Sequence, residues 1–439
     1  MTRTSRLPGF YKVSVEERRA LVSDATGTGE DDIARSLEAG GLAEDTADKF
    51  VENVIGTYGL PYGVALNVRV NGHDYVVPMV VEEPSVVAAA SNAARMVREG
   101  GGFIAEVDEP LMTAQVQLTG VRDRHAAVER ILESKRALLA LADTAIPGLV
   151  ERGGGARDLE VRPLGTDEDA MLVVHVYVDC RDAMGANLVN GMAERIAPNL
   201  AEIAGGRIGL RILSNLCDRR RVRVSCRVPA KALATEELPG TDVIEGIANA
   251  SRFAELDPYR AATHNKGIMN GVDAVVIATG NDWRAVEAGA HAFAARDGKY
   301  HPLATWRRDG DHLVGKLEMP LALGTVGGTL RVHPAARLSL RLLSVTSAQD
   351  LAQVAAAVGL ASNLAAVRAL GTCGIQRGHM ALHARSVAVA AGATGNEVER
   401  VAAMIVEARD ITLEAAQKAL AVARGSEAES ARALEDWEK

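Results

Sequence analysis

The chain is poor in aromatic residues, which make up only 3% of its 439 residues. Proteins that bind single-stranded nucleic acids stack the bases on aromatic side chains. A basic surplus is absent too, because 49 Lys and Arg stand against 57 Asp and Glu, a formal net charge of −8. Since phosphate backbones are bound by basic surfaces, these two absences argue against a nucleic-acid partner.

Cysteine is also scarce, and its four positions lie far apart without a CxxC pair: Cys180, Cys217, Cys226 and Cys373. This spacing disfavours a zinc site and a disulfide scaffold, so we expect reduced, mostly buried thiols and no bound metal. No uninterrupted apolar run reaches the roughly 18 residues of a membrane helix, and no apolar signal core follows the basic N-terminus. We therefore predict a cytoplasmic protein with no membrane partner.

Apolar residues, by contrast, are plentiful at 48% of the chain, against 24% charged. That balance is typical of a globular protein with a sizeable core. A length of 439 residues exceeds the roughly 150 that one domain usually contains. We predict an α+β fold in four segments: a first part of a large domain (1–109), an inserted small domain (110–218), a second part of the large domain (219–374) and a helical C-terminal segment (375–439).

Local patterns predict the elements around the polar motifs. Asn71-Gly72 between two alternating apolar runs predicts a β-hairpin over residues 64–81, and an Ala-rich run predicts a buried helix at 86–97. Within residues 113–213 the patterns predict strands at 113–121, 159–162, 172–178 and 207–213, a long helix at 126–143 and a second helix at 187–196. We also expect a strand at 273–278, a hairpin near 303–319 and helices from residue 348 onward.

Residues 182–187 join an alternating strand to a helix and predict an anion site. Backbone N–H groups at a helix N-terminus have no partners within the helix and attract negative charge. The alternative is a plain helix cap by Asp182, with Gly185 relieving a tight turn. No GxGxxG is present, so a dinucleotide site here departs from the Rossmann pattern.

Glu82 and Glu83 stand at the start of the apolar helix, and one of them could act as a general acid. The alternative is that they only complement the helix dipole in a first turn. A proton donor near neutral pH needs a raised pKa, which the helix dipole opposes.

A dense polar cluster precedes the predicted strand at 273–278 and comprises Arg260, His264, Asn265, Lys266 and Asn270. Gly280-Asn281-Asp282 follows that strand. Donors, a cation and a carboxylate around an apolar segment are what an oxyanion-stabilising site requires. A surface helix with ordinary caps is the alternative.

His379 and His383 lie four residues apart in the C-terminal segment. Such a pair can bind a metal, but no HExxH glutamate or acidic third ligand accompanies it. A structural pair and acid–base chemistry remain as alternatives.

Together these motifs resemble the bacterial class (class II) of 3-hydroxy-3-methylglutaryl-coenzyme A (HMG-CoA) reductases. The resemblance is collinear over nearly the whole chain and rests on VENVIG with PYGVALNV, VVEEPSVVAAAS, DAMGAN, ATHNKGIMNGVDAVVIATGNDWRAVEAGAH and RGHMALHARSVA. It implies interconversion of HMG-CoA with mevalonate and coenzyme A by two hydride transfers. It also implies a large domain around a central helix, a small ferredoxin-like dinucleotide-binding domain, a mobile C-terminal flap, and a homo-oligomer built from dimers with shared active sites.

The resemblance assigns four catalytic roles. Glu83 corresponds to the acidic proton donor, Lys266 to the cation that stabilises the thioester oxyanion, and Asp282 to the carboxylate coupled to that lysine. His379, rather than His383, corresponds to the flap histidine that protonates the coenzyme A thiolate.

The resemblance also assigns two sets of binding residues. Contacts to the HMG moiety are expected from Ser85, Asn215, Arg260 and Asn270. The cofactor pyrophosphate is expected at Asp182, Ala183, Met184, Gly185, Ala186 and Asn187.

The cofactor is expected to be NADH first, with NADPH as the alternative. In NADH-using relatives an acidic residue shortly before the triple-glycine break contacts the ribose, but here Asp143 lies further back, while Arg152 or Arg157 could accept a 2′-phosphate. Two rival functions are a dehydrogenase of another acyl-CoA thioester and an inactive CoA- or nucleotide-binding paralogue. Arg260 argues against the first, because an arginine at the acyl end expects a second carboxylate.

Overall fold

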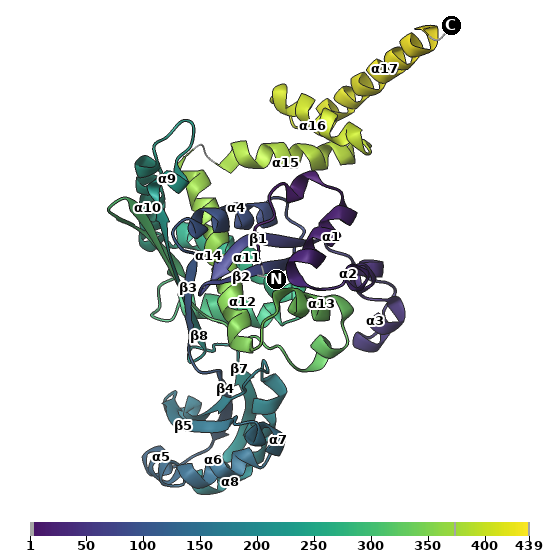
Figure 1. Ribbon diagram of the computed structural model, residues 1–439. Helices are drawn as coiled ribbons and strands as arrows, with labels where there is room; N and C mark the ends of the chain where they lie inside the picture. Colours follow the sequence, from purple (N-terminus) through teal and green to yellow (C-terminus); the bar gives the residue numbers. More distant parts are fainter. Residues whose placement is uncertain (1–3, 373–374, 438–439) are drawn as a thin grey trace.

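The computed structural model describes the backbone of residues 4–372 and 375–437, and their side chains apart from those of 39, 329, 375–382 and 426–437. The chain forms a large central body, a smaller unit at one end and a set of C-terminal helices at the other (Figure 1).

The large domain contains a six-stranded sheet in the order β2-β1-β3-β8-β10-β9. Its strands are β1 (Tyr62–Val70), β2 (His73–Val80), β3 (Phe103–Val107), β8 (Arg221–Pro229), β9 (Ala304–Asp309) and β10 (His312–Pro320). β1 and β2 pair antiparallel across the turn at Asn71 and Gly72, where both residues have a positive φ. The hairpin predicted at residues 64–81 is thereby confirmed.

Helices pack against one face of this sheet and carry most of the core. They are α4 (Val86–Arg98), α10 (Gly240–Leu256), α11 (Pro258–Ala278), α12 (Trp283–Ala294) and α14 (Ala348–Gly371). α14 is long and apolar enough to cross a membrane by length and composition alone, but 67% of its most apolar window is buried in the protein. It is the central helix of the large domain, and the interior position of its side chains explains its hydrophobicity.

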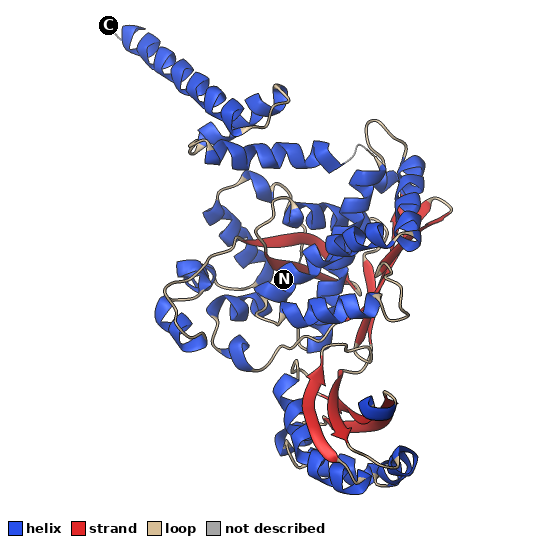
Figure 2. Ribbon diagram, turned by 180° about the vertical axis from the view of Figure 1, so that it is seen from behind, coloured by secondary structure: helices blue, strands red, loops and turns tan. Residues whose placement is uncertain are grey.

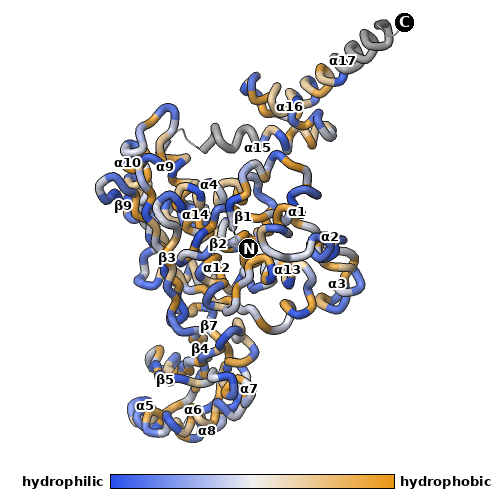
Figure 3. Tube along the Cα trace, in the orientation of Figure 1, coloured by the Kyte–Doolittle hydropathy of each residue, from blue (hydrophilic) through white to orange (hydrophobic). Residues whose placement is uncertain are grey.

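The small domain is an antiparallel four-stranded sheet with helices on one face (Figure 2). Its elements are β4 (Leu111–Thr119), α5 (Arg124–Glu133), α6 (Lys135–Asp143), α7 (Pro147–Glu151), β5 (Gly155–Leu164), β6 (Met171–Asp179), α8 (Ala186–Ala204) and β7 (Arg207–Ser214). The strand order β5-β6-β4-β7, combined with helices after the first and third strands, is the ferredoxin-like topology. Hydrophilic and hydrophobic residues alternate along α5, α6 and α8, as amphipathic helices on a sheet require (Figure 3).

Shorter helices complete the fold at both ends of the chain. At the N-terminus lie η1 (Phe10–Lys12), α1 (Val15–Thr26), α2 (Glu30–Leu37), η2 (Glu38–Gly41) and α3 (Glu44–Phe50); elsewhere lie η3 (Asp167–Asp169), α9 (Ala230–Leu233), η4 (Gly328–Arg331) and α13 (Pro334–Leu343). The C-terminal helices are α15 (Ile375–Ala390), α16 (Asn396–Glu407) and α17 (Leu413–Trp437), and they have a hydrophobic cluster of their own.

The strand predicted at residues 273–278 is wrong, because this segment is the last part of α11. Asp257 is the N-cap of this helix and its side chain accepts from the N–H of Arg260, while Pro258 is the first helical residue. Its final turns are buried on nearly all sides, and a short apolar run of that kind has no period that separates strand from helix. Strands β3 and β8 were not predicted, and the long helix expected over 126–143 is split at Ser134 into α5 and α6.

Candidate active site

Lys266 and Glu83 lie together, as their predicted roles require. Lys266 Nζ is 2.6 Å from Glu83 Oε2, and both side chains remain accessible, at 59% and 35% exposed. Lys266 projects from the middle of α11, while Glu83 lies between β2 and α4. Glu83 precedes the helix that begins at Val86, so it is not a first-turn residue complementing the dipole.

Ser85 stands two residues beyond Glu83 and has an unusual backbone. Its φ is +77°, in the left-handed region that non-glycine residues seldom occupy. Its Oγ is buried and has no hydrogen-bond partner in the described part of the chain. Because a buried hydroxyl normally finds a partner, this strained, unpaired group close to Glu83 in the chain suits a ligand contact.

Arg260 and Asn270 lie on the same helix as Lys266. Asn270 is one turn further along α11 and shares a face with Lys266. Burial lowers the pKa of Arg260, and among the described residues its guanidinium has no carboxylate partner. A half-buried cation without a counter-ion can pair with an anionic ligand.

His264 is excluded from acid–base chemistry near neutral pH. Burial, reinforced by the neighbouring Arg260, lowers its pKa to about 4. Its Nε2 donates to the carbonyl of Ala304 at 3.0 Å. It is a buried neutral histidine that joins α11 to β9.

Asp282 is the N-cap of α12. Its Oδ1 accepts hydrogen bonds from the N–H groups of Arg284 and Ala285, and it forms a 3.4 Å ion pair with the Arg284 side chain. Among the described residues it therefore has no contact with Lys266. The preceding Asn281 binds Gly324 through both its amide oxygen and its amide nitrogen, at 2.8 and 3.1 Å.

The predicted anion turn at residues 182–187 lies next to Gly324. A Cβ on Gly324 would come within 2.6 Å of Met184 N. The N-cap of α8 is Gly185, with φ +110° and no side-chain cap. Asp182 is turned elsewhere, because its carboxylate accepts from the N–H of Ala348 at the start of α14, so the helix-cap alternative for Asp182 is wrong.

The α8 N-terminus can accommodate an anionic ligand. A Cβ on Gly185 would come within 2.5 Å of Cys180 Sγ, so the turn requires glycine. Among the described residues the N–H of Gly185 donates no hydrogen bond. A free amide at the start of a 19-residue helix fits a pyrophosphate.

Asn215 lies close to α12, the helix that Asp282 caps. Its side chain is exposed, and its carbonyl lies where a Cβ on Gly289 of α12 would come within 2.6 Å. It follows β7 of the small domain and precedes β8 of the large domain, so it stands where the two domains meet.

The predicted residues thus form two separate groups within one chain. The first, which we call the lysine half-site, contains Glu83, Ser85, Arg260, Lys266 and Asn270. The second, the turn half-site, contains Asn215, Asp282 and residues 182–187. Asn281 N–H bonds to the carbonyl of Val276, and ten residues of helix separate Val276 from Lys266, about 15 Å along the axis.

His379 belongs to α15, but its side chain lies outside the described residues. The neighbouring His383 is exposed. α15 contacts the end of α14 and lies at the end of the large domain opposite the small domain (Figure 1). Within one chain, the C-terminal helices are therefore remote from the turn half-site.

Asp143 reaches the triple-glycine break although it stands ten residues before it. Its Oδ1 accepts the N–H of Ala156 at 2.7 Å and lies against Gly155. Arg157 is engaged by the carboxylate of Asp179 at 3.0 Å. Arg152 has no carboxylate partner among the described residues.

A polar chain between α11 and α12 was missed by the sequence reasoning. Asp273 lies beside Glu287. The Glu287 carboxylate is 2.6 Å from His291 Nε2, and His291 Nδ1 is 2.7 Å from the Tyr300 hydroxyl. Burial and the Glu287 carboxylate raise the pKa of Asp273. The four-residue spacing of Glu287 and His291 on a helix was the available signal.

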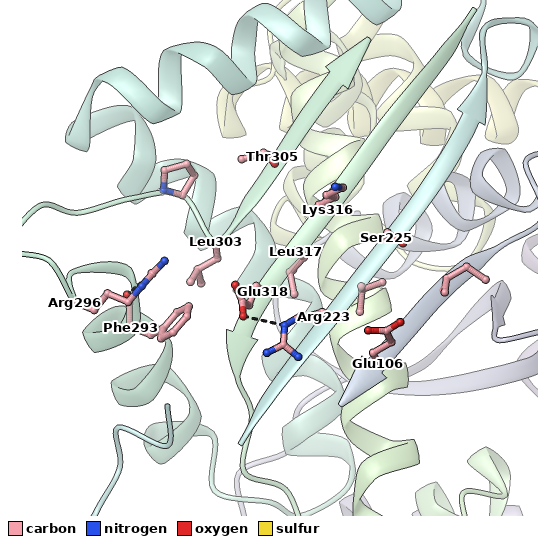
Figure 4. A pocket seen from close by; sticks show the side chains of 13 residues that line it. Glu106, Arg223, Ser225, Phe293, Arg296, Leu303, Thr305, Lys316, Leu317 and Glu318 are labelled. Atoms are coloured by element: carbon pink, nitrogen blue, oxygen red, sulfur yellow. Dashed lines mark hydrogen bonds and ion pairs between the residues drawn. The ribbon is translucent and has the colours of Figure 1, made fainter. Parts of the chain in front are cut away.

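A cavity of about 400 Å³ opens on the sheet face of β3, β8 and β10, near the end of α12. It is lined by mixed charges, including the Arg223–Glu318 pair, Glu106, Lys316 and Arg296 (Figure 4). Of the predicted catalytic and binding residues whose side chains the structure describes, none lines this cavity, so it is not the site described above.

Comparison with known proteins decides the family. Residues 14–384 match the model of the hydroxymethylglutaryl-coenzyme A reductase family. The chain belongs to this family. It is 50% identical to the 3-hydroxy-3-methylglutaryl-coenzyme A reductase of Archaeoglobus fulgidus, over 95% of this chain and 94% of that one. A probable HMG-CoA reductase of Borreliella burgdorferi is 35% identical over 78% of each chain.

Solved structures agree with this assignment. HMG-CoA reductase from Streptococcus pneumoniae matches with a TM-score of 0.80 and 45% identity, over 94% of this chain and 98% of that one. A second structure, of the class II enzyme of that organism bound to NADPH in open conformations, matches with a TM-score of 0.79 and 46% identity, over 83% and 99%. The predicted class II resemblance and α+β fold are confirmed. The chain is an oxidoreductase of HMG-CoA that uses a nicotinamide cofactor.

Proposed function

We propose that the lysine half-site of one subunit and the turn half-site of a partner subunit together form one active site for reduction of HMG-CoA to mevalonate. The proposal is supported by the spacing of Lys266 and Asp282, which one helix holds apart while both are expected at the same reacting carbon. A symmetric dimer brings such groups together twice, because each chain contributes to both sites.

The lysine half-site suits the first reduction. Addition of hydride to the thioester carbonyl converts its planar carbon into a tetrahedral one and leaves a negative charge on its oxygen. The Lys266 ammonium can stabilise that oxygen, and loss of one such donor typically costs about 3 kcal/mol of transition-state stabilisation. A nicotinamide cofactor would supply the hydride, and residues 182–187 would hold its pyrophosphate. In the described part of the chain the N–H of Gly185 has no partner and is available to that group.

Two carboxyl groups, Glu83 and the partner subunit's Asp282, would lie next to Lys266 in the shared site. Glu83 is hydrogen-bonded to Lys266, so a proton can pass from that carboxyl or from the ammonium to the developing alkoxide. The partner subunit's Asp282 would add a second carboxylate beside this pair. His379 on the C-terminal segment protonates the leaving coenzyme A thiolate, a step suited to an imidazolium near neutral pH.

The lysine half-site also accounts for the acyl group. Arg260 has no carboxylate partner among the described residues, so it is free to pair with the distal carboxylate of HMG, while Ser85 Oγ and Asn270 donate to its other oxygens. A dehydrogenase of a simple acyl-CoA has no use for the arginine.

We infer NADH as the preferred cofactor. The observation that favours it is Asp143, whose carboxylate reaches the triple-glycine break and would repel a 2′-phosphate. NADPH is the second candidate, favoured by its presence in the related Streptococcus pneumoniae structure and by Arg152, which has no carboxylate partner in the described part of the chain.

Parallel kinetics test both parts of this proposal. Purified protein with HMG-CoA should oxidise the reduced nicotinamide, and kcat/KM should be higher with NADH than with NADPH. Asp143→Asn should narrow this difference, whereas Arg152→Gln should leave NADH kinetics unchanged. If kcat/KM is higher with NADPH, and Arg152→Gln abolishes that difference, NADPH is the preferred cofactor. The proposed reduction of HMG-CoA would still hold.

A further inference from the structure

Arg220 is a buried cation at the junction of the two domains. Arg220 is only 5% exposed. Its guanidinium donates to the carbonyl of Leu323 at 2.6 Å and to those of Ala183 and Met184 at 3.3 and 3.2 Å. Leu323 belongs to the large domain and the other two to the anion turn, so one side chain joins both domains.

These contacts orient the turn. In a trans peptide the C=O and N–H groups point in opposite directions, and the described residues contain no cis peptide. When Arg220 holds the carbonyl of Met184, the N–H of Gly185 must point away from the arginine. This is the amide that has no partner among the described residues and precedes the first turn of α8.

The same contacts place a positive charge behind the turn. Among the described residues, the hydrogen-bond partners of the Arg220 side chain are backbone carbonyls, and the Asp179 and Asp182 carboxylates attract it only from beyond ion-pair distance. Burying a guanidinium without a carboxylate costs free energy, and a neutral donor could bridge two carbonyls at lower cost. A buried cation instead raises the potential at the helix N-terminus, where the dipole already favours an anion.

We propose that Arg220 is a positioning residue for the pyrophosphate of the nicotinamide cofactor, which it serves by orienting the amide of Gly185 and by raising the positive potential in front of the turn. Through Leu323 it also fixes the turn beside Gly324, the residue bound by Asn281. The inference rests on the proposed placement of the pyrophosphate at residues 182–187.

Arg220→Gln and Arg220→Lys test the proposal. The Gln variant loses the charge and at least one carbonyl contact, so the KM for the cofactor should rise about tenfold or more, while the KM for HMG-CoA stays within about twofold. The Lys variant keeps the charge and should show a smaller rise. Calorimetry should show the same loss in Kd for the cofactor without turnover, and inorganic pyrophosphate should compete less well with the cofactor.

Arg227→Gln is the matched control, because Arg227 forms an exposed ion pair with Asp309. Its cofactor KM should equal that of the wild type. An unchanged cofactor Kd in a folded Arg220→Gln or Arg220→Lys variant would overturn the proposal, as would an equal rise in KM for both substrates. Gly185→Ala distinguishes failure of the pyrophosphate placement from failure of the role of Arg220. If this variant leaves the cofactor Kd unchanged, the pyrophosphate lies elsewhere. If it weakens cofactor binding and Arg220→Gln does not, only the role of Arg220 is wrong.

Discussion

Lys266 lies on α11 and Asp282 is the N-cap of the next helix, α12, yet their side chains bind different partners. Lys266 Nζ pairs with Glu83 at 2.6 Å, whereas Asp282 caps α12 and pairs with Arg284. About 15 Å of α11 separates Lys266 from the turn that carries Asp282. Two residues that are expected at one reacting carbon therefore lie in different half-sites, and the experiments below test this division.

Substitutions should distinguish the role of Lys266 from that of Glu83. Lys266→Ala removes the cation that stabilises the oxyanion, and kcat should fall by about a hundredfold or more. Glu83→Gln keeps a hydrogen-bonding group beside Lys266 but cannot give up a proton, so kcat should fall while the KM for HMG-CoA changes little. Single-turnover measurements would check both, and full activity in folded Lys266→Ala would reject its role.

Ser85 offers a paired test of strain against function. Ser85→Gly should relieve the cost of φ +77°, worth about 1 kcal/mol in the free energy of unfolding. It also removes the hydroxyl, so the KM for HMG-CoA should rise about fivefold. Ser85→Ala should raise that KM equally without added stability. Equal KM values in both variants and the wild type would show that the hydroxyl does not contact substrate.

Arg260 should matter to HMG-CoA and little to the fold. Because it has no carboxylate partner among the described residues, Arg260→Gln removes no ion pair from the free enzyme. Loss of a charge-assisted bidentate contact to the substrate carboxylate should raise the KM for HMG-CoA about a hundredfold. Arg307→Gln, which breaks the ion pair with Glu255, is the control that should lower stability without altering KM.

Asp273 should make stability depend on pH. Burial and Glu287 raise its pKa, so above its ordinary value of 3.8 the folded state retains a proton that the unfolded state releases. Its contribution to stability therefore falls as pH rises from about 4 toward the folded pKa.

The Asn side chain of Asp273→Asn does not titrate. The free energy of unfolding of this variant, relative to that of the wild type, should therefore be higher at pH 8 than at pH 5. Urea unfolding at the two pH values measures this gain. Asp309→Asn, on an exposed ion pair, should show no such trend. A pH-independent difference between Asp273→Asn and the wild type would contradict the raised pKa of Asp273; Glu287, His291 and Tyr300 remain in both proteins.

The features that the sequence could predict are those determined by residues close together in the chain. The Asn71-Gly72 turn and most elements of the small domain follow from local patterns, and the structure confirms them. The proximity of Glu83 and Lys266 was expected only through the family resemblance, because 183 residues separate them in the chain.

Buried positions explain what the sequence could not predict. The end of α11 has no apolar period because almost every side of it is covered, so its pattern resembles that of a buried strand. Arg220 stands between Arg219 and Arg221, and nothing in that run distinguishes the buried arginine from its more exposed neighbours. Asp182 looked like a cap for α8, but its partner is the N–H of Ala348, 166 residues away.

Subunit complementation tests the shared site most directly. Lys266→Ala and Asp282→Asn should each be inactive alone, and the two chains should be co-expressed in equal amounts. In a mixed dimer, one site carries both substitutions and the other carries neither. Because half of randomly paired dimers are mixed, activity should recover to about a quarter of the wild-type value. A co-expressed mixture no more active than the separate variants would contradict a site shared between Lys266 of one chain and the partner subunit's Asp282.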